Sequence, residues 1–354
     1  MKHTTIRSPI HIQTELPLDE TRRKTISSFR RTIRNIFDHT DRRFLMVVGP
    51  CSFHDPIACL EYACKLKRLA NEVSDTMFIV MRVYVEKPRT AVGWKGYLSD
   101  PFLDESYQIE EGIRSARETM LEISTLGLPI SSELLNPMSY LYFNDLISWG
   151  AIGARTTESQ PHREIASQLD VPVGIKNSTS GNIETAINSI FCVAQPQIFM
   201  GMNDEGQIAV IHSQGNPYGH LVLRGGHQGV NYKSEHVAHA EKTLAKFNLP
   251  QNIIIDCSHG NAENNYLNQA TVLNHVIEQK CQGNQSIAGV ILESFIKSGN
   301  QDIPTDLSLL QYGCSITDNC LGWEETEALI RHAHQRLSNH AQAKLSLSER
   351  RETC

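Results

Sequence analysis

The sequence predicts an α/β protein, a closed (β/α)8 TIM barrel with an N-terminal extension and an inserted β-hairpin. Eight short runs of apolar and β-branched residues recur along the chain from Phe44 onward. Helix-patterned stretches of about 15 to 30 residues separate most of these runs, as in a series of βαβ units. Eight such units within about 250 residues favour a closed barrel over an open, doubly wound sheet. No glycine-rich dinucleotide fingerprint follows the first run, which weakens that alternative further.

Residues 1–43 are expected to form the N-terminal extension, which ends in an amphipathic helix. The apolar residues Ile26, Phe29, Ile33 and Phe37 recur there at helical spacing. Acidic residues are interspersed with the basic pairs of this segment. A helix packed on the body of the protein is therefore favoured over an arm that binds nucleic acid.

A single catalytic barrel is expected over residues 44–340. Its eight strands are expected at residues 44–49, 77–85, 128–135, 151–157, 171–177, 220–226, 252–258 and 287–294. Residues 198–202 and 207–213 flank the turn sequence Asn-Asp-Glu-Gly, which predicts a hairpin over 198–213, between the fifth and sixth strands. Such an addition usually serves oligomer contacts or regulation. Residues 341–354 are expected to form a C-terminal tail.

The composition excludes several classes of protein. The 354 residues are 40% hydrophobic and 20% charged, with a net charge of −6, which gives no general attraction to nucleic acid or anionic lipid. No apolar run reaches the roughly 18 residues of a membrane span, and the N-terminus lacks the apolar segment of a secretory signal. Nine scattered cysteines without a CxxC pair argue against a disulfide framework. We therefore expect a cytoplasmic enzyme or binding protein with reduced thiols.

A side chain of a functional type lies at or just beyond the end of every expected strand. These residues are Cys51, Arg82, Glu133, Arg155, Lys176, Arg224, His259 and Glu293. The carboxyl ends of barrel strands meet at one face, where active sites of this fold are built. An exposed rim would explain one such residue but not all eight, so we expect an active site there.

Six cations are expected to converge on this face. They are Arg82, Lys87, Arg89, Arg155, Lys176 and Arg224. Together they would repel one another unless the ligand is a polyanion. Arginine offers paired donors to phosphate or carboxylate, and lysine offers a point charge. The sequence therefore predicts substrates that carry phosphate and carboxylate groups.

A second set of residues has the chemistry of metal ligands. Cys51, His259, Glu293 and Asp318 supply a thiol, an imidazole and two carboxylates, which suit one divalent first-row metal. The first, seventh and eighth strands adjoin in a closed barrel, which favours a ligand role for Cys51 over that of an inert buried thiol. The cysteines expected to be structural or incidental are Cys59, Cys64, Cys192, Cys281 and Cys354.

Long motifs in a fixed order carry a resemblance to a known family. They are GPCSFHDP (49–56), EKPRTAVGWKGYLSDP (86–101), SWGAIGARTTESQPHRE (148–164), PVGIKNSTSG (172–181), LRGG (223–226), IDCSHGN (255–261), ILESF (291–295) and YGCSITDNCLGWEET (312–326). From about residue 44 to 335 the chain strongly resembles the microbial type I 3-deoxy-D-arabino-heptulosonate 7-phosphate (DAHP) synthases. The barrel, the extension and the hairpin of that family agree with the pattern derived above.

The resemblance implies a 3-deoxy-7-phosphoheptulonate synthase, a transferase that forms a carbon–carbon bond. It would condense phosphoenolpyruvate with erythrose 4-phosphate and water to give DAHP and phosphate, the first step of the shikimate pathway to chorismate and the aromatic amino acids. It also implies one divalent metal ion per subunit (Mn, Fe, Co or Zn) and a homodimer or homotetramer. The related 3-deoxy-D-manno-octulosonate 8-phosphate synthases lack the KPRT form of Arg89 and Thr90. A catalytically silent barrel is disfavoured because the set of functional residues is complete.

The resemblance also implies a role for each residue. The metal ligands would be Cys51, His259, Glu293 and Asp318. The contacts to phosphoenolpyruvate would be Arg82, Lys87, Glu133, Arg155, Lys176 and Arg224, and those to erythrose 4-phosphate Arg89, Thr90 and Asp318. The catalytic groups would be Lys87, Glu133, His259 and Asp318. Lys87 would offer a proton to the alkoxide, and the attacking water would be held either by the metal or by Glu133.

Members of this family are inhibited by aromatic amino acids that bind beside the hairpin. The corresponding positions are Ile165, Leu169, Asp170, Phe199, Gly201 and Ile211. Asp170 would contact the ammonium group of the inhibitor. Phenylalanine-responsive members tend to carry serine at the positions of Asp170 and Gly201. The space left at Gly201 favours tyrosine or tryptophan, with loss of feedback as the alternative.

Overall fold

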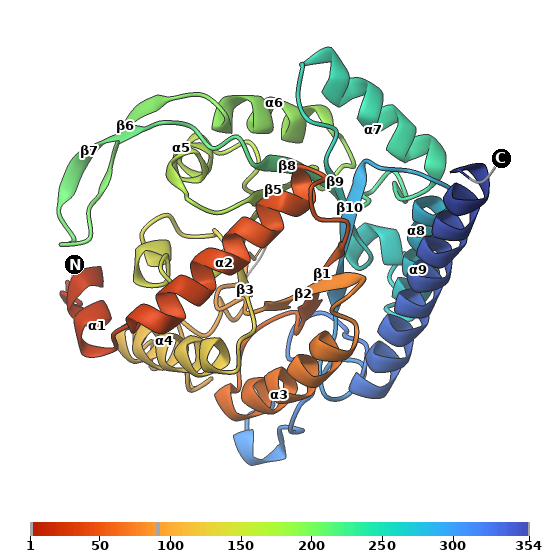
Figure 1. Ribbon diagram of the computed structural model, residues 1–354. Helices are drawn as coiled ribbons and strands as arrows, with labels where there is room; N and C mark the ends of the chain where they lie inside the picture. Colours follow the sequence, from red (N-terminus) through yellow and green to blue (C-terminus); the bar gives the residue numbers. More distant parts are fainter. Residues whose placement is uncertain (1–2, 90–92, 353–354) are drawn as a thin grey trace.

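Eight parallel strands close into a barrel, which Figure 1 shows. The computed structural model describes residues 3–89 and 93–352, with side chains as far as residue 343. The strand order around the barrel is β1-β10-β9-β8-β5-β4-β3-β2. The strands are β1 (Phe44–Gly49), β2 (Met77–Arg82), β3 (Ile130–Glu133), β4 (Ile147–Ile152), β5 (Val173–Lys176), β8 (Gly219–Leu223), β9 (Ile253–Asp256) and β10 (Ile287–Glu293). The predicted closed barrel is confirmed, and the open sheet is wrong.

Helices follow the strands and cover the outside of the barrel (Figure 1). They are α3 (Pro56–Glu72), α4 (Ile109–Thr125), α5 (Gln160–Gln168), α6 (Glu184–Val193), α7 (Ser234–Lys246), α8 (Asn268–Cys281) and α9 (Trp323–Glu352). Short 3-10 turns lie at Ser139–Tyr142, His259–Ala262 and Leu307–Leu309. α9 continues past residue 340, so the segment expected as a tail begins within this helix.

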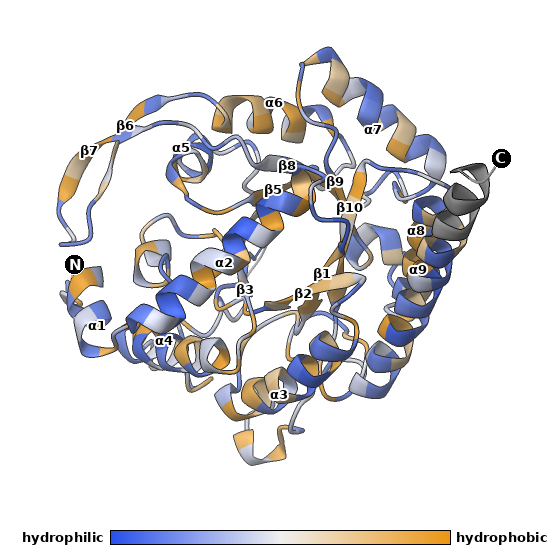
Figure 2. Ribbon diagram, viewed as in Figure 1, coloured by the Kyte–Doolittle hydropathy of each residue, from blue (hydrophilic) through white to orange (hydrophobic). Residues whose placement is uncertain are grey.

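Local sequence explains how these helices begin and which side they bury. α3 begins at Pro56, whose ring suits the first helical position, and the side chain of Asp55 accepts hydrogen bonds from the N–H groups of Ile57 and Ala58. One face of α3 buries Tyr62 and Leu66 against the barrel. Figure 2 shows the resulting arrangement, with apolar residues on the barrel strands and mixed polarity along the surrounding helices.

The N-terminal extension closes one end of the barrel. It contains α1 (Pro9–Glu15) and α2 (Glu20–Phe37), of which only α2 was predicted. Ile33, Ile36 and Phe37 of α2 belong to the same buried cluster as the residues that fill the barrel interior. The guanidinium of Arg30 donates to the carbonyl of Ile147 at 2.8 Å, which ties α2 to the first residue of β4. The extension is thus part of the core.

The predicted hairpin lies outside the barrel, between β5 and β8 in the chain (Figure 1). Its strands, β6 (Gln197–Met202) and β7 (Ile208–Ser213), pair antiparallel with Phe199 opposite Ile211. The Asn203 side chain accepts the N–H of Gln207 at 2.8 Å and so closes the turn. The N–H of Ile10 donates to the carbonyl of Asp204, which joins the N-terminal segment to the hairpin tip.

The fourth strand differs from its predicted position. It occupies Ile147–Ile152, whereas the sequence pattern indicated residues 151–157. Residues 153–157 form a turn in which the hydroxyl groups of Thr156 and Thr157 donate to the carbonyl of Gly153. These local bonds compete with the strand ladder, so Arg155 lies in a loop three residues beyond β4.

Candidate active site

A polar cavity of about 120 Å³ lies at the carboxyl ends of the barrel strands. It is lined by Arg82, Tyr84, Lys87, Pro88, Arg89, Glu133, Gly153, Ala154, Arg155, Lys176, Thr179, Arg224, His259, Glu293 and Asp318. The structure thus brings together all six predicted cations and four of the predicted acidic and imidazole groups. Cys51 lies beside the cavity, 3.3 Å from Asp318. Thr90, the remaining residue predicted for the active site, falls outside the described residues.

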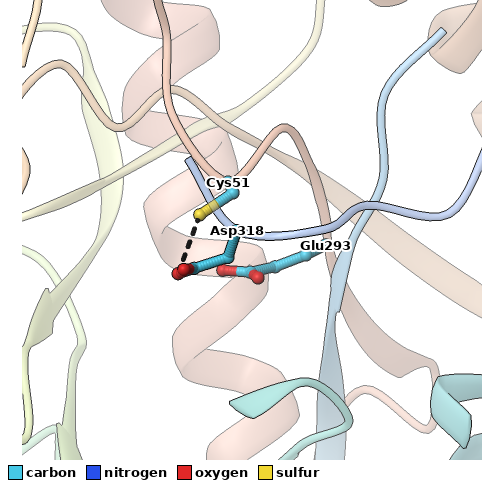
Figure 3. A group of neighbouring side chains, drawn as sticks. All are labelled: Cys51, Glu293 and Asp318. Atoms are coloured by element: carbon cyan, nitrogen blue, oxygen red, sulfur yellow. Dashed lines mark hydrogen bonds between the residues drawn. The ribbon is translucent and has the colours of Figure 1, made fainter. Parts of the chain in front are cut away.

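Three of the four predicted metal ligands gather at one point (Figure 3). The sulfur of Cys51 and one carboxylate oxygen each of Glu293 and Asp318 all lie within 4.8 Å of one another. The fourth, His259, places its Nε2 atom 3.8 Å from Oε1 of Glu293. Mixed sulfur, nitrogen and oxygen donors fit a divalent first-row metal such as Mn, Fe, Co or Zn.

Strand pairing explains why residues so distant in sequence meet here. β1 pairs with β10 so that Gly49 lies opposite Glu293, which places Cys51 near the end of β10. The segment before α9 continues this arrangement, because the N–H of Leu321 donates to the carbonyl of Glu293 at 2.9 Å. Asp318 is therefore held above the first and last barrel strands.

Burial, assisted by the charge of Glu293, raises the pKa of the Cys51 thiol to about 12. Lys87 opposes this effect, since its Nζ atom lies 3.0 Å from the sulfur. For Lys87 itself, burial alone would lower the pKa of the ammonium group. The neighbouring Cys51, Glu293 and Asp318 outweigh the effect of burial, so the pKa of Lys87 is raised. Lys87 is thus held as a charged ammonium group between the thiol and the cavity.

Asp256 orients His259 and Lys176. Its carboxylate is fully buried, and Oδ2 lies 2.8 Å from Lys176 Nζ and 3.0 Å from Nδ1 of His259. Burial would raise the pKa of Asp256, but the two neighbouring bases lower it well below its ordinary value. Nδ1 of His259 also lies 2.7 Å from the Ser258 hydroxyl. With Nδ1 held by these two groups, Nε2 of His259 faces the predicted metal ligands, an arrangement common among metal-bound histidines. Sequence reasoning missed Asp256, although it ends an apolar strand three residues before the predicted His259.

The cations lie close to one another, as expected for a site that binds an anion. Arg82 is almost fully buried and donates to Oε1 of Glu293 at 2.9 Å. Burial lowers the pKa of Arg224, and the positive charge of Arg155 lowers it further. An anionic ligand would relieve this repulsion.

Gly153 makes room for Glu133. A Cβ atom at Gly153 would lie 2.2 Å from Oε1 of Glu133, so any larger residue would displace the carboxylate. Glu133 ends β3 and reaches the cavity through this space.

Three buried or partly buried amides fix the loop that carries Arg224. Oδ1 of Asn177 accepts the N–H of Arg224 at 2.9 Å and the side-chain amide of Asn231 at 3.1 Å. Asn231 in turn accepts the N–H of Gly225 at 2.7 Å and donates its own N–H to Asn261 at 2.8 Å. Sequence reasoning missed this network because uncharged amides stand out neither by charge nor by ligand chemistry.

A second cavity, of about 200 Å³, lies between α5 and the hairpin. Its lining includes Ile165, Phe199 and Gly201, three of the positions predicted to bind an effector. The polar side chains in the lining are Glu164 and Gln168, which were not predicted. The cavity therefore combines an apolar wall with a carboxylate and an amide.

The other predicted effector positions lie around this cavity and do not line it. Leu169 is buried, and Asp170 pairs with Arg34 at 2.5 Å and with Arg30 at 3.6 Å. Ile211 fills the space beside Gly201, because a Cβ atom there would lie 2.9 Å from Cγ1 of Ile211. Ile211 therefore occupies part of the space that was expected at Gly201 for the side chain of an inhibitor.

The fold and the site define a class: a (β/α)8 barrel enzyme with a cation-lined cavity beside a set of metal-type ligands. The chain belongs to the DAHP synthetase I family, whose sequence model matches residues 15–331. None of the helices in the described part of the chain combines the length and apolar character that a bilayer span requires.

Individual relatives are similar over nearly the whole chain. The "Phospho-2-dehydro-3-deoxyheptonate aldolase, Tyr-sensitive" of Escherichia coli (strain K12) is 46% identical over 341 residues, which cover 96% of each protein. The Phe-sensitive enzyme of the same strain is 45% identical over 323 residues, 91% of this chain and 92% of that one. The solved structure of the Francisella tularensis SCHU S4 aldolase of this name superposes with a TM-score of 0.93 at 40% identity, covering 95% of this chain and 98% of that chain.

Proposed function

We propose that this protein is a DAHP synthase, which condenses phosphoenolpyruvate with D-erythrose 4-phosphate and water to give DAHP and inorganic phosphate. The observation that carries the proposal is the convergence of six cations on a cavity that adjoins Cys51, His259, Glu293 and Asp318. Both substrates are phosphorylated, and phosphoenolpyruvate adds a carboxylate. The cavity thus has the charge that the two substrates need.

Phosphoenolpyruvate occupies the inner part of this cavity. Arg82, Lys176 and Arg224 are buried or partly buried there, whereas Arg155 and Arg89 are exposed. The inner cations, with Arg155 and Lys87, hold the phosphate and carboxylate of phosphoenolpyruvate. Arg89 and Thr90, with Asp318, bind erythrose 4-phosphate. Holding both substrates in register converts a bimolecular encounter into a local reaction.

Cys51, His259, Glu293 and Asp318 would hold the divalent metal. When bound there, the metal supplies Lewis acidity toward the aldehyde oxygen of erythrose 4-phosphate. Asp256 keeps the imidazole of His259 in the tautomer that leaves Nε2 available as a ligand.

Lys87 and Glu133 perform the proton chemistry. C3 of phosphoenolpyruvate attacks C1 of erythrose 4-phosphate, and the aldehyde oxygen takes a proton from the Lys87 ammonium group. Water held by Glu133 then adds to the electron-poor C2 and gives a proton to the Glu133 carboxylate. The resulting hemiketal phosphate breaks its C–O bond, which releases phosphate and leaves the C2 ketone. The raised pKa of Lys87 favours its charged form before the transfer.

An assay of phosphoenolpyruvate consumption tests this function directly. We expect consumption with erythrose 4-phosphate, release of one phosphate per turnover and loss of activity with EDTA. Arabinose 5-phosphate in place of erythrose 4-phosphate distinguishes the related eight-carbon synthases. Turnover of arabinose 5-phosphate alone would contradict the proposal.

We further propose that an aromatic amino acid inhibits the enzyme by binding in the cavity beside the hairpin. Phe199 and Ile165 would contact its ring, and Glu164 offers a carboxylate to its ammonium group. Gln168 offers a partner to a ring hydroxyl or indole N–H, which favours tyrosine or tryptophan over phenylalanine. Isothermal titration with all three amino acids ranks them. Tightest binding of phenylalanine would refute the preference, and no binding would refute the site.

A homodimer or homotetramer is proposed from the same resemblance. Ile198, Met200, Ile208 and Val210 are 67–77% exposed on the hairpin, and a second copy of the chain would cover them. Replacing Met200 and Val210 by Lys is expected to reduce the oligomer measured by light scattering.

Cytoplasmic location is also proposed, since eight cysteines within the described range are free thiols.

A further inference from the structure

Two buried polar atoms at the floor of the active-site cavity have no hydrogen-bond partner among the described residues. They are the hydroxyl of Tyr84 and the Nη1 atom of Arg82. Both side chains line the cavity, and they are 2% and 1% exposed. Buried polar atoms are nearly always paired, and one left unpaired costs stability. Two such atoms in one cavity indicate a polar ligand.

Packing fixes the position of Tyr84. Its ring belongs to the cluster that fills the barrel interior, with Val47 and Trp149 among its members. Its carbonyl accepts the N–H of Phe53 at 2.9 Å, which fixes the backbone beyond β2. The hydroxyl therefore cannot turn toward solvent without disturbing the core.

Tyr84 and Arg82 are held against each other. The guanidinium of Arg82 lies over the Tyr84 ring, with its central carbon 4.0 Å from the ring centre. Arg82 also donates to Glu293 through Nη2 and to the carbonyl of Pro50 through Nε. These contacts use three sides of the guanidinium and leave Nη1 for a ligand.

Burial keeps the Tyr84 hydroxyl in its protonated form, so it can act as a hydrogen-bond donor. Burial raises the pKa of Tyr84 in spite of the nearby cations Arg82 and Lys176. The hydroxyl therefore keeps its proton at neutral pH. A neutral donor beside two cations is suited to an anionic oxygen.

We propose that Tyr84 is a substrate-binding residue whose hydroxyl donates a hydrogen bond to an anionic oxygen of phosphoenolpyruvate, beside Nη1 of Arg82. The inference rests on the proposed function, which places phosphoenolpyruvate in this cavity. It assigns two tasks to one side chain: the ring supports Arg82, and the hydroxyl contacts the substrate.

The variant Tyr84→Phe separates these tasks, because it keeps the ring and removes the hydroxyl. We expect the KM and Kd for phosphoenolpyruvate to rise about tenfold to a hundredfold, the range for a hydrogen bond to a charged group. The KM for erythrose 4-phosphate should stay unchanged. The Tm without ligand should stay equal or rise, because an unpaired buried hydroxyl has been removed, while the increase in Tm caused by phosphoenolpyruvate should shrink.

Tyr142→Phe is the matched control. Tyr142 is also buried, but its hydroxyl already donates to the carbonyl of Arg7 at 2.7 Å, away from the active-site cavity. This control should lower the Tm without ligand and leave phosphoenolpyruvate binding unchanged. Unchanged phosphoenolpyruvate binding in Tyr84→Phe, as in this control, would overturn the inference.

Two further measurements complete the test. Tyr84→Leu removes the ring as well and should weaken phosphoenolpyruvate binding more than Tyr84→Phe does. If the two variants weaken binding equally, the ring does not support Arg82. Inorganic phosphate is the second probe: weaker phosphate binding by Tyr84→Phe assigns the contact to the phosphate group, and unchanged phosphate binding assigns it to the carboxylate. If Arg224→Ala weakens phosphoenolpyruvate binding but Tyr84→Phe does not, only the inference fails. If wild-type protein does not bind phosphoenolpyruvate, the proposed function fails.

Discussion

His220 is expected to make the protein less stable in mild acid. Its ring is buried in β8, where Nε2 accepts the indole N–H of Trp149 at 3.1 Å and Nδ1 donates to the carbonyl of Tyr218 at 3.0 Å. Both ring nitrogens are thus used by the neutral form. A second proton, on Nε2, would point at the Trp149 N–H. Burial also disfavours the charged ring and lowers the pKa of His220 from its ordinary 6.5 to about 4.

The size and sign of the effect follow from this difference in pKa. Between pH 6.5 and 4 the unfolded chain binds a proton at position 220 that the folded protein excludes. Stability is therefore fully present above pH 6.5 and falls as the pH falls toward 4. At about 1.4 kcal/mol per pH unit, the total loss is about 3 kcal/mol.

Urea unfolding of wild-type protein and His220→Gln across this pH range measures the effect. Glutamine keeps an acceptor for Trp149 and a donor for Tyr218 but does not titrate. The difference in unfolding free energy between the two proteins should change by about 3 kcal/mol from pH 6.5 to 4. Replacing the exposed His212 by Gln should cause no such change. Parallel curves for wild type and His220→Gln would refute the reasoning.

Three predictions concern the active site. EDTA should abolish activity and Mn²⁺ should restore it. Cys51→Ala should lose Mn²⁺ binding and keep its circular dichroism spectrum. Full activity after metal removal would contradict the predicted metal ligands. Lys87→Ala should depress kcat, because a proton donor is lost, whereas Arg89→Ala should mainly raise the KM for erythrose 4-phosphate. A change confined to the KM for phosphoenolpyruvate in the Arg89 variant would mean that the two substrate sites are reversed. Asp256→Asn should weaken Mn²⁺ binding about tenfold to a hundredfold in a chelator competition, because His259 loses its orienting carboxylate, and unchanged affinity would argue against that role.

Much of the fold followed from periodicity alone. The eight apolar runs predicted the barrel, and the turn sequence at Asn203–Gly206 predicted the hairpin, because both signals are local. The fourth strand was misplaced, since Ser148 interrupts the apolar run at its start while threonine hydroxyls bond back to Gly153 and turn the chain at its end. The length of α9 was also missed, because its last turns are polar.

The gathering of functional residue types at the strand ends was predictable from the sequence, but the pairings between them were not. Nothing in the local sequence links Asp256 to Lys176, because the contact depends on the order of strands around the barrel. Asp170 illustrates the reverse case: its charge suggested a ligand contact, but two arginines of α2 pair with it. Such partners become visible only when distant segments are placed side by side.

The position of α2 has a consequence for how the chain folds during synthesis. Ile33 and Phe37 leave the ribosome before any barrel strand, yet they pack on a cluster that extends from Leu45 to Ile291. β1 likewise cannot pair with β10, its partner in the closed barrel, until β10 has been synthesised. Contacts between such distant segments slow folding, because a long loop must close before any contact forms. α2 is therefore synthesised long before its binding surface exists, and during this interval the nascent chain is most exposed to aggregation and to chaperones.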